Sequence, residues 1–320
     1  MKEHQMKLAI LARLATGGFH SGEALGEELG ISRAAVSKHI KGIQAWGVDI
    51  FRVQGKGYQL AQPMELLSEK RLAQSVSTPF ELIPIIDSTN QYLLDKQESL
   101  DSGSVGISEY QAKGRGRRGR QWVSPFGSNL YLSMYWRLEA GMAAAMGLSL
   151  VVGVAIVEAL QELGIEGVKL KWPNDLYYRD KKLAGILVEM SGQAGGAANL
   201  VIGMGMNLNM SEQVTGIDQP WTSLSEVVDT PFSRNDLVVA FIKAWQAALE
   251  DYELRGLHGF VERWNQHDNF LGREVKLIMG QREIKGIVQG IDATGAVLLE
   301  TERGIESYVG GEISLRKADV

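Results

Sequence analysis

Residues 171–189 read KWPNDLYYRDKKLAGILVE, and they decide how the centre of the chain folds. They continue an alternation of apolar residues with lysines that begins at Val168, which is typical of a strand with one buried face. Pro-Asn-Asp at 173–175 interrupts this strand, and Arg-Asp-Lys at 179–181 predicts a hairpin turn. The stretch therefore predicts a strand–turn–strand unit with Lys182 fixed at the beginning of its second strand.

Two charged side chains of this unit could take part in chemistry. A lysine held at position 182 can neutralise a carboxylate that attacks phosphorus, and Asp175 can orient a cation or Mg²⁺ beside a nucleotide. Taken singly, a lysine and an aspartate are more often surface charges. Other motifs must therefore support a catalytic interpretation.

Short strand-like and helical runs surround this unit. They span residues 82–87, 90–97, 106–111, 130–136, 143–163, 168–172, 183–190 and 200–206. The alternation predicts an α/β central domain whose loops hold functional groups on a rigid frame. The stretch 140–157 carries no charged residue but is rich in Ala and Gly, so we expect a buried helix and no membrane span.

The second motif is GRGRRGR at residues 114–120, preceded by Lys113. It satisfies G-x-G-x-x-G, but the apolar helix of a dinucleotide fold does not follow, and the Lys-Ser/Thr of a Walker A loop is absent. Four arginines in seven residues repel one another unless an anion neutralises them, and the glycines let backbone approach a ligand. We predict a loop that orders over bound phosphate; the alternative is a basic nucleic-acid-binding or solvated loop.

The third motif, Asp-Ser-Thr-Asn at 87–90, follows the apolar run LIPII. Ser, Thr and Asn are the residues that a helix start prefers, so helix capping explains this motif when it is considered alone. A binding role depends on the other motifs.

Residues 1–60 have the pattern of a winged helix-turn-helix. Apolar residues at helical spacing predict three helices, the second and third capped by Ser21 and Ser32 and separated by Gly30. Two short strands and a Gly-containing turn then predict a wing with Lys56 at its tip.

The exposed face of the third helix is predicted to be polar and basic. The residues off its apolar stripe suit base edges and phosphates in a major groove: Arg33, Ser37, Lys38 and Lys41. The net charge of -5 is unevenly divided, since residues 1–60 carry eight Lys or Arg against five acids, which leaves -8 for the remainder. This asymmetry favours a module that binds a polyanion; the alternative is a small bundle that binds only protein.

The chain contains no cysteine, which excludes disulfides, thiolate nucleophiles and Cys-ligated metals and fits a reducing cytoplasm. Its first residues lack the apolar core of a secretory signal. From Leu271 onward, strand patterns alternate with turns and predict a small antiparallel barrel. With Pro63 as a boundary, we expect three domains, over residues 1–62, 63–270 and 271–320.

Together, the three central motifs closely resemble those of the biotin–protein ligase family. The matching segments are DSTN at 87–90, GRGRRGR at 114–120 with Trp122 after it, and KWPNDLY and KLAGILVE within 171–189. With the winged helix and GGEISLR at 310–316, the chain is similar to bifunctional bacterial biotin ligases and biotin operon repressors over nearly its whole length. This resemblance implies a winged helix-turn-helix, a mixed-sheet ligase domain and an SH3-like C-terminal barrel.

The resemblance implies a two-step reaction. Biotin would react with MgATP to give biotinyl-5′-AMP, and a lysine of the biotin carboxyl carrier protein of acetyl-CoA carboxylase would take the biotinyl group. A ligand-induced homodimer would repress biotin-synthesis genes by binding operator DNA. Biotin, ATP and Mg²⁺ would be required, with the metal near Asp175, and the protein would be cytoplasmic without a membrane partner.

Residue roles also follow from the resemblance. The implied catalytic residues are Lys182, Arg117 and Asp175. The implied biotin contacts are Ser88, Thr89, Asn90, Gln111, Arg115, Gly116, Arg117 and Lys182. The implied ATP or adenylate contacts are Gly114, Arg118, Arg120, Trp122, Asn174 and Asn207. The implied DNA contacts are Ser32, Arg33, Ser37, Lys38, Lys41 and Lys56. One departure is Ala112-Lys113, where the family pattern has Gln-Ala; it makes the loop more basic without touching these roles.

Two other functions are weighed beside this one. A transcription factor whose central domain only binds biotin or biotinyl-AMP would have an inert Lys182. Transfer of lipoate or octanoate on a related fold would not be expected to use an arginine-dense loop or a winged helix. The residues alone do not identify the acyl group.

Overall fold

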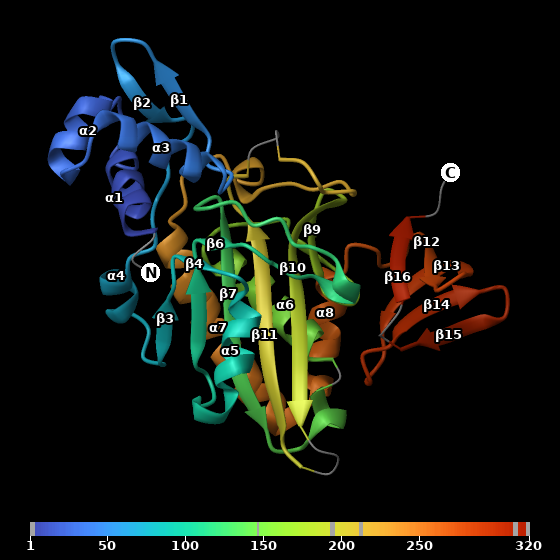
Figure 1. The fold of residues 1–320 in the computed structure, drawn as a ribbon. Coiled ribbons are helices and arrows are strands. Elements are labelled where there is room, and N and C mark those ends of the chain that lie inside the picture. Colours follow the sequence, from blue (N-terminus) through green and yellow to red (C-terminus); the bar gives the residue numbers. More distant parts are fainter. Residues whose placement is uncertain (1–3, 146, 193–195, 211–213, 310–312, 318–320) are drawn as a thin grey trace.

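The computed structural model describes residues 4–145, 147–192, 196–210, 214–309 and 313–317. They form an N-terminal module of helices with a hairpin, a central sheet covered by helices, and a smaller C-terminal sheet (Figure 1). The predicted fold class is therefore confirmed. Of the predicted motif at 310–316, residues 310–312 lie outside the described residues.

The N-terminal module is a winged helix-turn-helix. Its elements are α1 (Gln5–Leu14), α2 (Gly22–Leu29), α3 (Arg33–Gln44), β1 (Ile50–Val53) and β2 (Gly57–Leu60). The predicted caps are present, because the hydroxyls of Ser21 and Ser32 accept hydrogen bonds from backbone amides in the first turns of α2 and α3. Gly30 has a φ of 67°, so it turns the chain between these helices at little steric cost.

A seven-stranded mixed sheet forms the centre of the molecule. Its strands, in spatial order, are β3 (Phe80–Leu82), β5 (Val105–Ser108), β7 (Asn129–Leu138), β11 (Ala198–Asn207), β10 (Lys181–Gly192), β9 (Asp175–Tyr178) and β8 (Lys169–Lys171). Only β3 and β5 are parallel among these neighbours. The predicted hairpin turn joins β9 to β10. Its residues Arg179 and Asp180 both have positive φ, as the two central residues of a type I′ turn do.

Helices cover both faces of the central sheet. They are α5 (Thr89–Lys96), α6 (Leu148–Glu162), α7 (Arg234–Arg255) and α8 (Val261–His267), with the short α4 (Glu69–Ala73) beside α7. Met134 and Trp136 of β7 share the main core with α6 and α7, whereas Tyr135 between them packs with Leu93 of α5. The expected uncharged helix is thus buried, and among the described residues no helix is both long and apolar enough to cross a membrane.

One predicted strand is interrupted. The expected strand over 82–87 is divided at Pro84, which has no amide hydrogen to donate to the sheet. The following β4 (Ile85–Ile86) leaves the main sheet and pairs with β6 (Tyr110–Gln111). The prediction of one continuous strand is therefore wrong.

The helical predictions also need correction. The helix expected over 143–163 begins at Leu148, because Gly147 has a φ of 91° and separates α6 from a 3₁₀ turn at Met142–Ala145. No element was predicted between residues 210 and 270, which contain α7 and α8.

The winged helix contacts the segments just before and just after the arginine loop, which we define as residues 114–122. Trp46, just after α3, stacks on Phe126 with ring centroids 5.7 Å apart, and its ring lies 6.0 Å from that of Tyr110. Tyr110 precedes the loop and Phe126 follows it. The winged helix and the two segments that flank the loop are therefore joined by aromatic contacts.

The linker after the winged helix is held by buried polar contacts. Glu65 accepts hydrogen bonds from Ser233 and Asn235 at the start of α7, at 3.0 and 2.8 Å. Between these two, Arg234 forms a 2.7 Å ion pair with Glu109, and both side chains are almost fully buried. The linker is thus fixed to the frame of the central sheet.

The C-terminal unit is a five-stranded antiparallel sheet. Its strands, in spatial order, are β15 (Gly304–Tyr308), β14 (Val297–Thr301), β13 (Arg282–Ile291), β12 (Glu274–Met279) and β16 (Ile313–Lys317). Trp172 of the central domain donates its indole N–H to Gly295 O at 2.9 Å, and Arg273 makes two hydrogen bonds to Asp180. These contacts anchor the sheet beside the turn that precedes β9 and beside the turn between β9 and β10.

Asp268 is half-buried at this junction. Its Oδ1 accepts a hydrogen bond from Phe270 N at 2.8 Å, whereas Oδ2 has no hydrogen-bond partner among the described residues. Burial raises the pKa of Asp268 from 3.8 to about 7. The folded state therefore favours the protonated carboxyl group, and the stability linked to this proton is lost as the pH rises from about 4 to about 7.

Replacing Asp268 by Asn should stabilise the protein at alkaline pH. The change removes a buried charge and keeps an oxygen for the Phe270 amide. We expect D268N to raise the free energy of unfolding by about 1–3 kcal/mol near pH 8, and by less near pH 5. Urea denaturation at both pH values measures this difference. An equal gain at both would contradict the raised pKa.

Candidate active site

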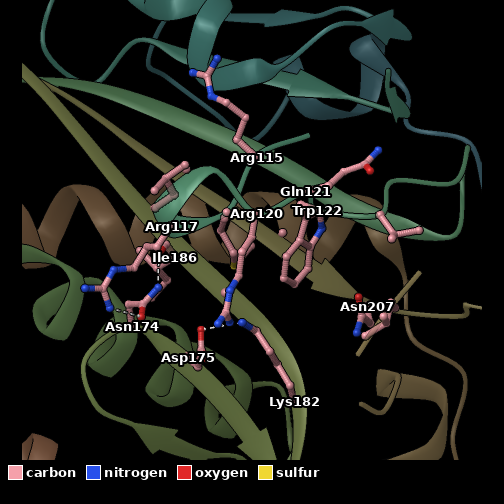
Figure 2. A pocket seen from close by; sticks show the side chains of 18 of the residues that line it. Arg115, Arg117, Arg120, Gln121, Trp122, Asn174, Asp175, Lys182, Ile186 and Asn207 are labelled. Atoms are coloured by element: carbon pink, nitrogen blue, oxygen red, sulfur yellow. Dashed lines mark hydrogen bonds and ion pairs between the residues drawn. The ribbon is translucent and has the colours of Figure 1, made fainter. Parts of the chain in front are cut away.

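A pocket of about 360 Å³ lies beneath the arginine loop at one end of the central sheet. It is lined by that loop, the start of α5, the turn before β9, strands β10 and β11, and the segment 216–221. Figure 2 shows the side chains of Arg120, Asp175 and Lys182 converging over the sheet. The three motifs singled out in the sequence therefore meet in one place.

Glycines form the floor of this pocket. A Cβ atom on Gly205 would lie 2.3 Å from the Trp122 indole, and one on Gly185 would lie 3.1 Å from the same ring. Trp122 therefore rests directly on β10 and β11. Its indole N–H is buried and has no hydrogen-bond acceptor among the described residues. A buried donor without an acceptor lowers the stability of the folded protein by about 1–3 kcal/mol, and an acceptor on a bound ligand would remove this penalty.

Neutral polar groups line the closed end of the pocket. The Ser88 hydroxyl caps α5 by accepting a hydrogen bond from the backbone amide of Gln91, so the capping interpretation is correct for this side chain. The Gln111 side-chain oxygen accepts hydrogen bonds from the amide and the hydroxyl of Thr89, at 2.9 and 3.1 Å. Asn90 is buried and donates to Glu189 at 2.8 Å. This end suits an uncharged ligand group with its own donors and acceptors.

The arginine loop is folded as a short hairpin. Trp122 N donates to Gly114 O at 2.9 Å, and Gly116 N donates to Arg120 O at 2.7 Å. Arg118 occupies the tip with a φ of 58°. At the base, a Cβ atom on Gly114 would lie 2.6 Å from Trp122 O. The first glycine of the motif is thus needed where the two stems pass each other closely.

The loop arginines differ in their surroundings. Arg117 donates to Asn174 Oδ1 at 3.1 Å, and its partial burial lowers its pKa. Arg118 and Arg120 are exposed, and Arg115 points away from the other labelled cations in Figure 2. A partly desolvated guanidinium such as Arg117 is stabilised by a nearby anion.

Lys182 and Asp175 form an ion pair on the wall of the pocket. Their Nζ and Oδ1 atoms are 2.8 Å apart, and each side chain is 15% exposed. The pairing of β9 with β10 shifts between Lys182 and Ala184, so Lys182 and Gly185 line the same pocket although they are three residues apart. The ion pair therefore holds the Lys182 side chain beside the floor of the pocket.

The pocket carries an excess of positive charge. Its lining includes two acidic side chains, Asp175 and Asp218, against six cationic ones: Arg115, Arg117, Arg118, Arg120, Lys171 and Lys182. Cations gathered in a partly closed space favour an anionic ligand with several oxygen atoms. Within the described ranges, no three His, Asp or Glu side chains are grouped so that they could hold a metal ion.

All of the predicted ligand contacts except Gly114 line the pocket. Their individual roles stay predictions. The lining also includes residues that the sequence patterns did not indicate, namely Gln121, Lys171, Gly185, Gly203, Gly205 and the segment 216–221. The alternation of Gly203 and Gly205 in β11 was a usable signal, since residues two apart in a strand share a face.

The predicted DNA contacts lie on the winged helix. Arg33, Lys38 and Lys41 are exposed on α3, and Lys56 is exposed in the turn of the wing. Ser32 is exposed and caps α3, and Ser37 is partly buried. The helix and the wing therefore present a basic surface, as a DNA-binding winged helix requires.

Comparison with known proteins covers all three units of the chain. The Biotin/lipoate A/B protein ligase family matches residues 82–207, the Biotin protein ligase C terminal domain matches 270–316, and an HTH domain matches 7–59. Among solved structures, the chain is similar to a biotin protein ligase from Aquifex aeolicus in complex with biotin and ATP. That match has a TM-score of 0.67 and 32% identity, and it covers 75% of this chain and 99% of the other.

Curated relatives match over greater lengths. The bifunctional ligase/repressor BirA of Escherichia coli (strain K12) is 53% identical over 321 residues, which is 100% of both chains. The bifunctional ligase/repressor BirA of Bacillus subtilis (strain 168) is 28% identical over 93% of this chain and 94% of its own. With its winged helix, its pocket beneath the arginine loop and this full-length similarity, the chain belongs to the biotin–protein ligase family, in its bifunctional ligase/repressor branch.

Proposed function

We propose that this chain is an ATP-dependent biotin–protein ligase and a DNA-binding repressor of biotin-synthesis genes. The observation that carries the proposal is the pocket, in which an excess of cations lies next to a neutral polar end, together with an indole N–H that has no acceptor in the described part of the chain. Biotinyl-AMP has the same division of polarity, with an uncharged ureido ring at one end and an adenylate phosphate at the other. The E. coli relative is named a ligase/repressor, and the A. aeolicus structure contains biotin and ATP.

In the proposed first step, a carboxylate oxygen of biotin attacks the α-phosphorus of ATP. A carboxyl–phosphate anhydride forms, the bond from the α-phosphorus to the bridging oxygen breaks, and pyrophosphate leaves with the electron pair. Lys182 and Arg117 stabilise the charge that develops on the phosphate oxygens. Asp175, 2.8 Å from Lys182, holds the Nζ atom of that lysine in place.

The substrate contacts follow the polarity of the pocket. The ureido ring is assigned to the neutral end, where it would contact Ser88, Thr89, Asn90 and Gln111. The backbone of Arg115 and Gly116 would lie over the acyl chain. The adenylate is assigned to the cationic side, with Arg118, Arg120, Trp122, Asn174 and Asn207. The Mg²⁺ that accompanies ATP needs only one or two protein carboxylates, because phosphates supply other ligands. Asp175 and Asp218 offer such a set.

In the proposed second step, the neutral amine of a carrier lysine attacks the carbonyl carbon of biotinyl-AMP. An amide bond forms, the bond from the carbonyl carbon to the phosphate oxygen breaks, AMP leaves with the electron pair, and the amine proton passes to solvent. A mixed anhydride hydrolyses readily, so the arginine loop must exclude water until the carrier docks. We expect the carrier to be the biotin carboxyl carrier protein of acetyl-CoA carboxylase, and the protein to act in the cytoplasm, where ATP, carrier and operator DNA are found together.

Weighing the carrier protein after reaction tests the ligase function. The enzyme is mixed with MgATP, a biotin carrier domain and biotin, lipoate or octanoate in turn. We expect one biotinyl group to be added, and only with biotin. Lys182→Ala should slow labelling by about 10²–10³-fold, because a charge that stabilises the transition state is lost. The exposed neighbour provides the matched control, Lys181→Ala, which should label at the wild-type rate.

The other outcomes separate the alternatives. No mass gain with any acid would indicate a transcription factor that only senses biotin. A gain with lipoate or octanoate would reassign the acyl group. Wild-type labelling by the Lys182→Ala variant would contradict the role given to this lysine.

The repressor function is assigned to the winged helix. A single module covers a short stretch of DNA, so we propose a homodimer that forms when the adenylate is bound and reads two half-sites. The exposed cations of α3 and of the wing would contact phosphates and base edges.

Replacing Lys38 or Lys41 by Ala should weaken DNA binding through the loss of phosphate contacts. In fluorescence anisotropy with a mixed-sequence duplex, each change should reduce the slope of log K against log salt concentration by about 1. The exposed Lys70 of α4 serves as the control, and Lys70→Ala should leave the slope unchanged. Wild-type slopes for both α3 variants would exclude this face as the DNA contact.

A further inference from the structure

We infer that Glu189 is a positioning residue that latches the base of the arginine loop and links it to the ureido end of the pocket. The inference rests on the proposed ligase function. Glu189 lies outside the proposed ligand contacts and acts on the loop through the side chain of Arg115.

The latch is a two-oxygen contact between Glu189 and Arg115. Arg115 Nη2 lies 3.1 and 2.9 Å from the two carboxylate oxygens, and its Nη1 donates to Gln91 Oε1 at 2.8 Å. The side chains of Arg115 and Glu189 are 34% and 30% exposed. A partly buried guanidinium whose two Nη atoms both donate hydrogen bonds is held more firmly than one in an exposed ion pair.

The position of Glu189 places it beside the pocket without forming part of it. It lies on β10 two residues after Leu187, which lines the pocket, so both side chains belong to the same face of the strand. Glu189 itself is not a lining residue. It therefore reaches the loop through Arg115 and has no direct contact with a ligand in the pocket.

A chain of polar contacts continues from Glu189 into the ureido end. Glu189 Oε2 accepts a hydrogen bond from Asn90 Nδ2 at 2.8 Å, and Asn90 Oδ1 lies 2.6 Å from Ser133 Oγ. Ser133 Oγ lies 2.7 Å from Thr89 Oγ1, which contacts Gln111. Asn90, Ser133 and Thr89 are buried, so water cannot readily replace these contacts.

The same chain returns to the far stem of the loop. Gln111 Nε2 donates to Ser124 Oγ at 3.2 Å, and Ser124 Oγ donates to Trp122 O at 3.0 Å. The two ends of the arginine loop are thus joined through the residues assigned to the ureido ring. Biotin bound at that end would stiffen the chain and, with it, the base of the loop.

The latch has two effects on the ligand. It holds the cation of Arg115 outside the cluster formed by Arg117, Arg120 and Lys182, which reduces repulsion in the pocket. It also fixes the base of the hairpin, where Arg115 bridges to Gln121. Without it, the base of the loop opens more often and biotinyl-AMP leaves faster.

Release of chemically synthesised biotinyl-AMP from the full-length protein tests the latch independently of catalysis. We expect Glu189→Gln and Arg115→Ala each to raise the release rate about tenfold, because a charge-assisted hydrogen bond is lost.

The double variant should release no faster than either single variant, since both changes break the same contact. Biotin-dependent pyrophosphate exchange by Glu189→Gln should change much less than its release of biotinyl-AMP. Glu81→Gln, which breaks the exposed pair between Glu81 of β3 and Lys96 of α5, is the control and should release at the wild-type rate.

Wild-type release from Glu189→Gln, or additive effects in the double variant, would overturn the latch. Thermal melting of each variant checks that it is folded; Glu189 is partly exposed and Gln has the same shape, so the fold should persist. Failure of the wild-type protein to make biotinyl-AMP from biotin and ATP would instead overturn the proposed ligase function. The two failures are thus distinguishable.

Discussion

Positive charge confined in a small pocket is the constraint on which the rest of the structure depends. Cations that line one cavity repel one another, and the protein offsets this repulsion at few points. Asp175 holds Lys182 on the wall, Glu189 draws Arg115 outward, and Asn174 accepts a hydrogen bond from Arg117. The remaining positive charge is left for a ligand, which explains why an anion should complete the site.

The other units of the molecule support this pocket from outside. Trp46 of the winged helix packs against Tyr110 and Phe126, which lie just before and just after the arginine loop. On the opposite side, Trp172 binds the C-terminal sheet next to the turn that carries Asn174. The same Trp46 contact can therefore link the ordering of the loop to the orientation of the DNA-binding module. Control of repression by a bound adenylate would need such a link.

Local signals in the sequence predicted much of this architecture. Caps at Ser21 and Ser32 and the turn at 179–181 depend only on nearby residues, and they are present as predicted. The register of distant strands is not a local property. Glu189 meets Asn90 across 99 residues, a contact that no spacing in the sequence reveals. α7 was missed although its buried apolar residues recur at helical spacing.

The central claim is that the pocket is built for the anion of an acyl-adenylate and not only for biotin. Calorimetric titration with biotinyl-AMP and with uncharged biotin methyl ester, over a range of salt concentrations, tests it most directly. Biotinyl-AMP should bind far more tightly, and its affinity alone should fall as salt increases. Equal affinities, or the same salt dependence for both ligands, would contradict this claim.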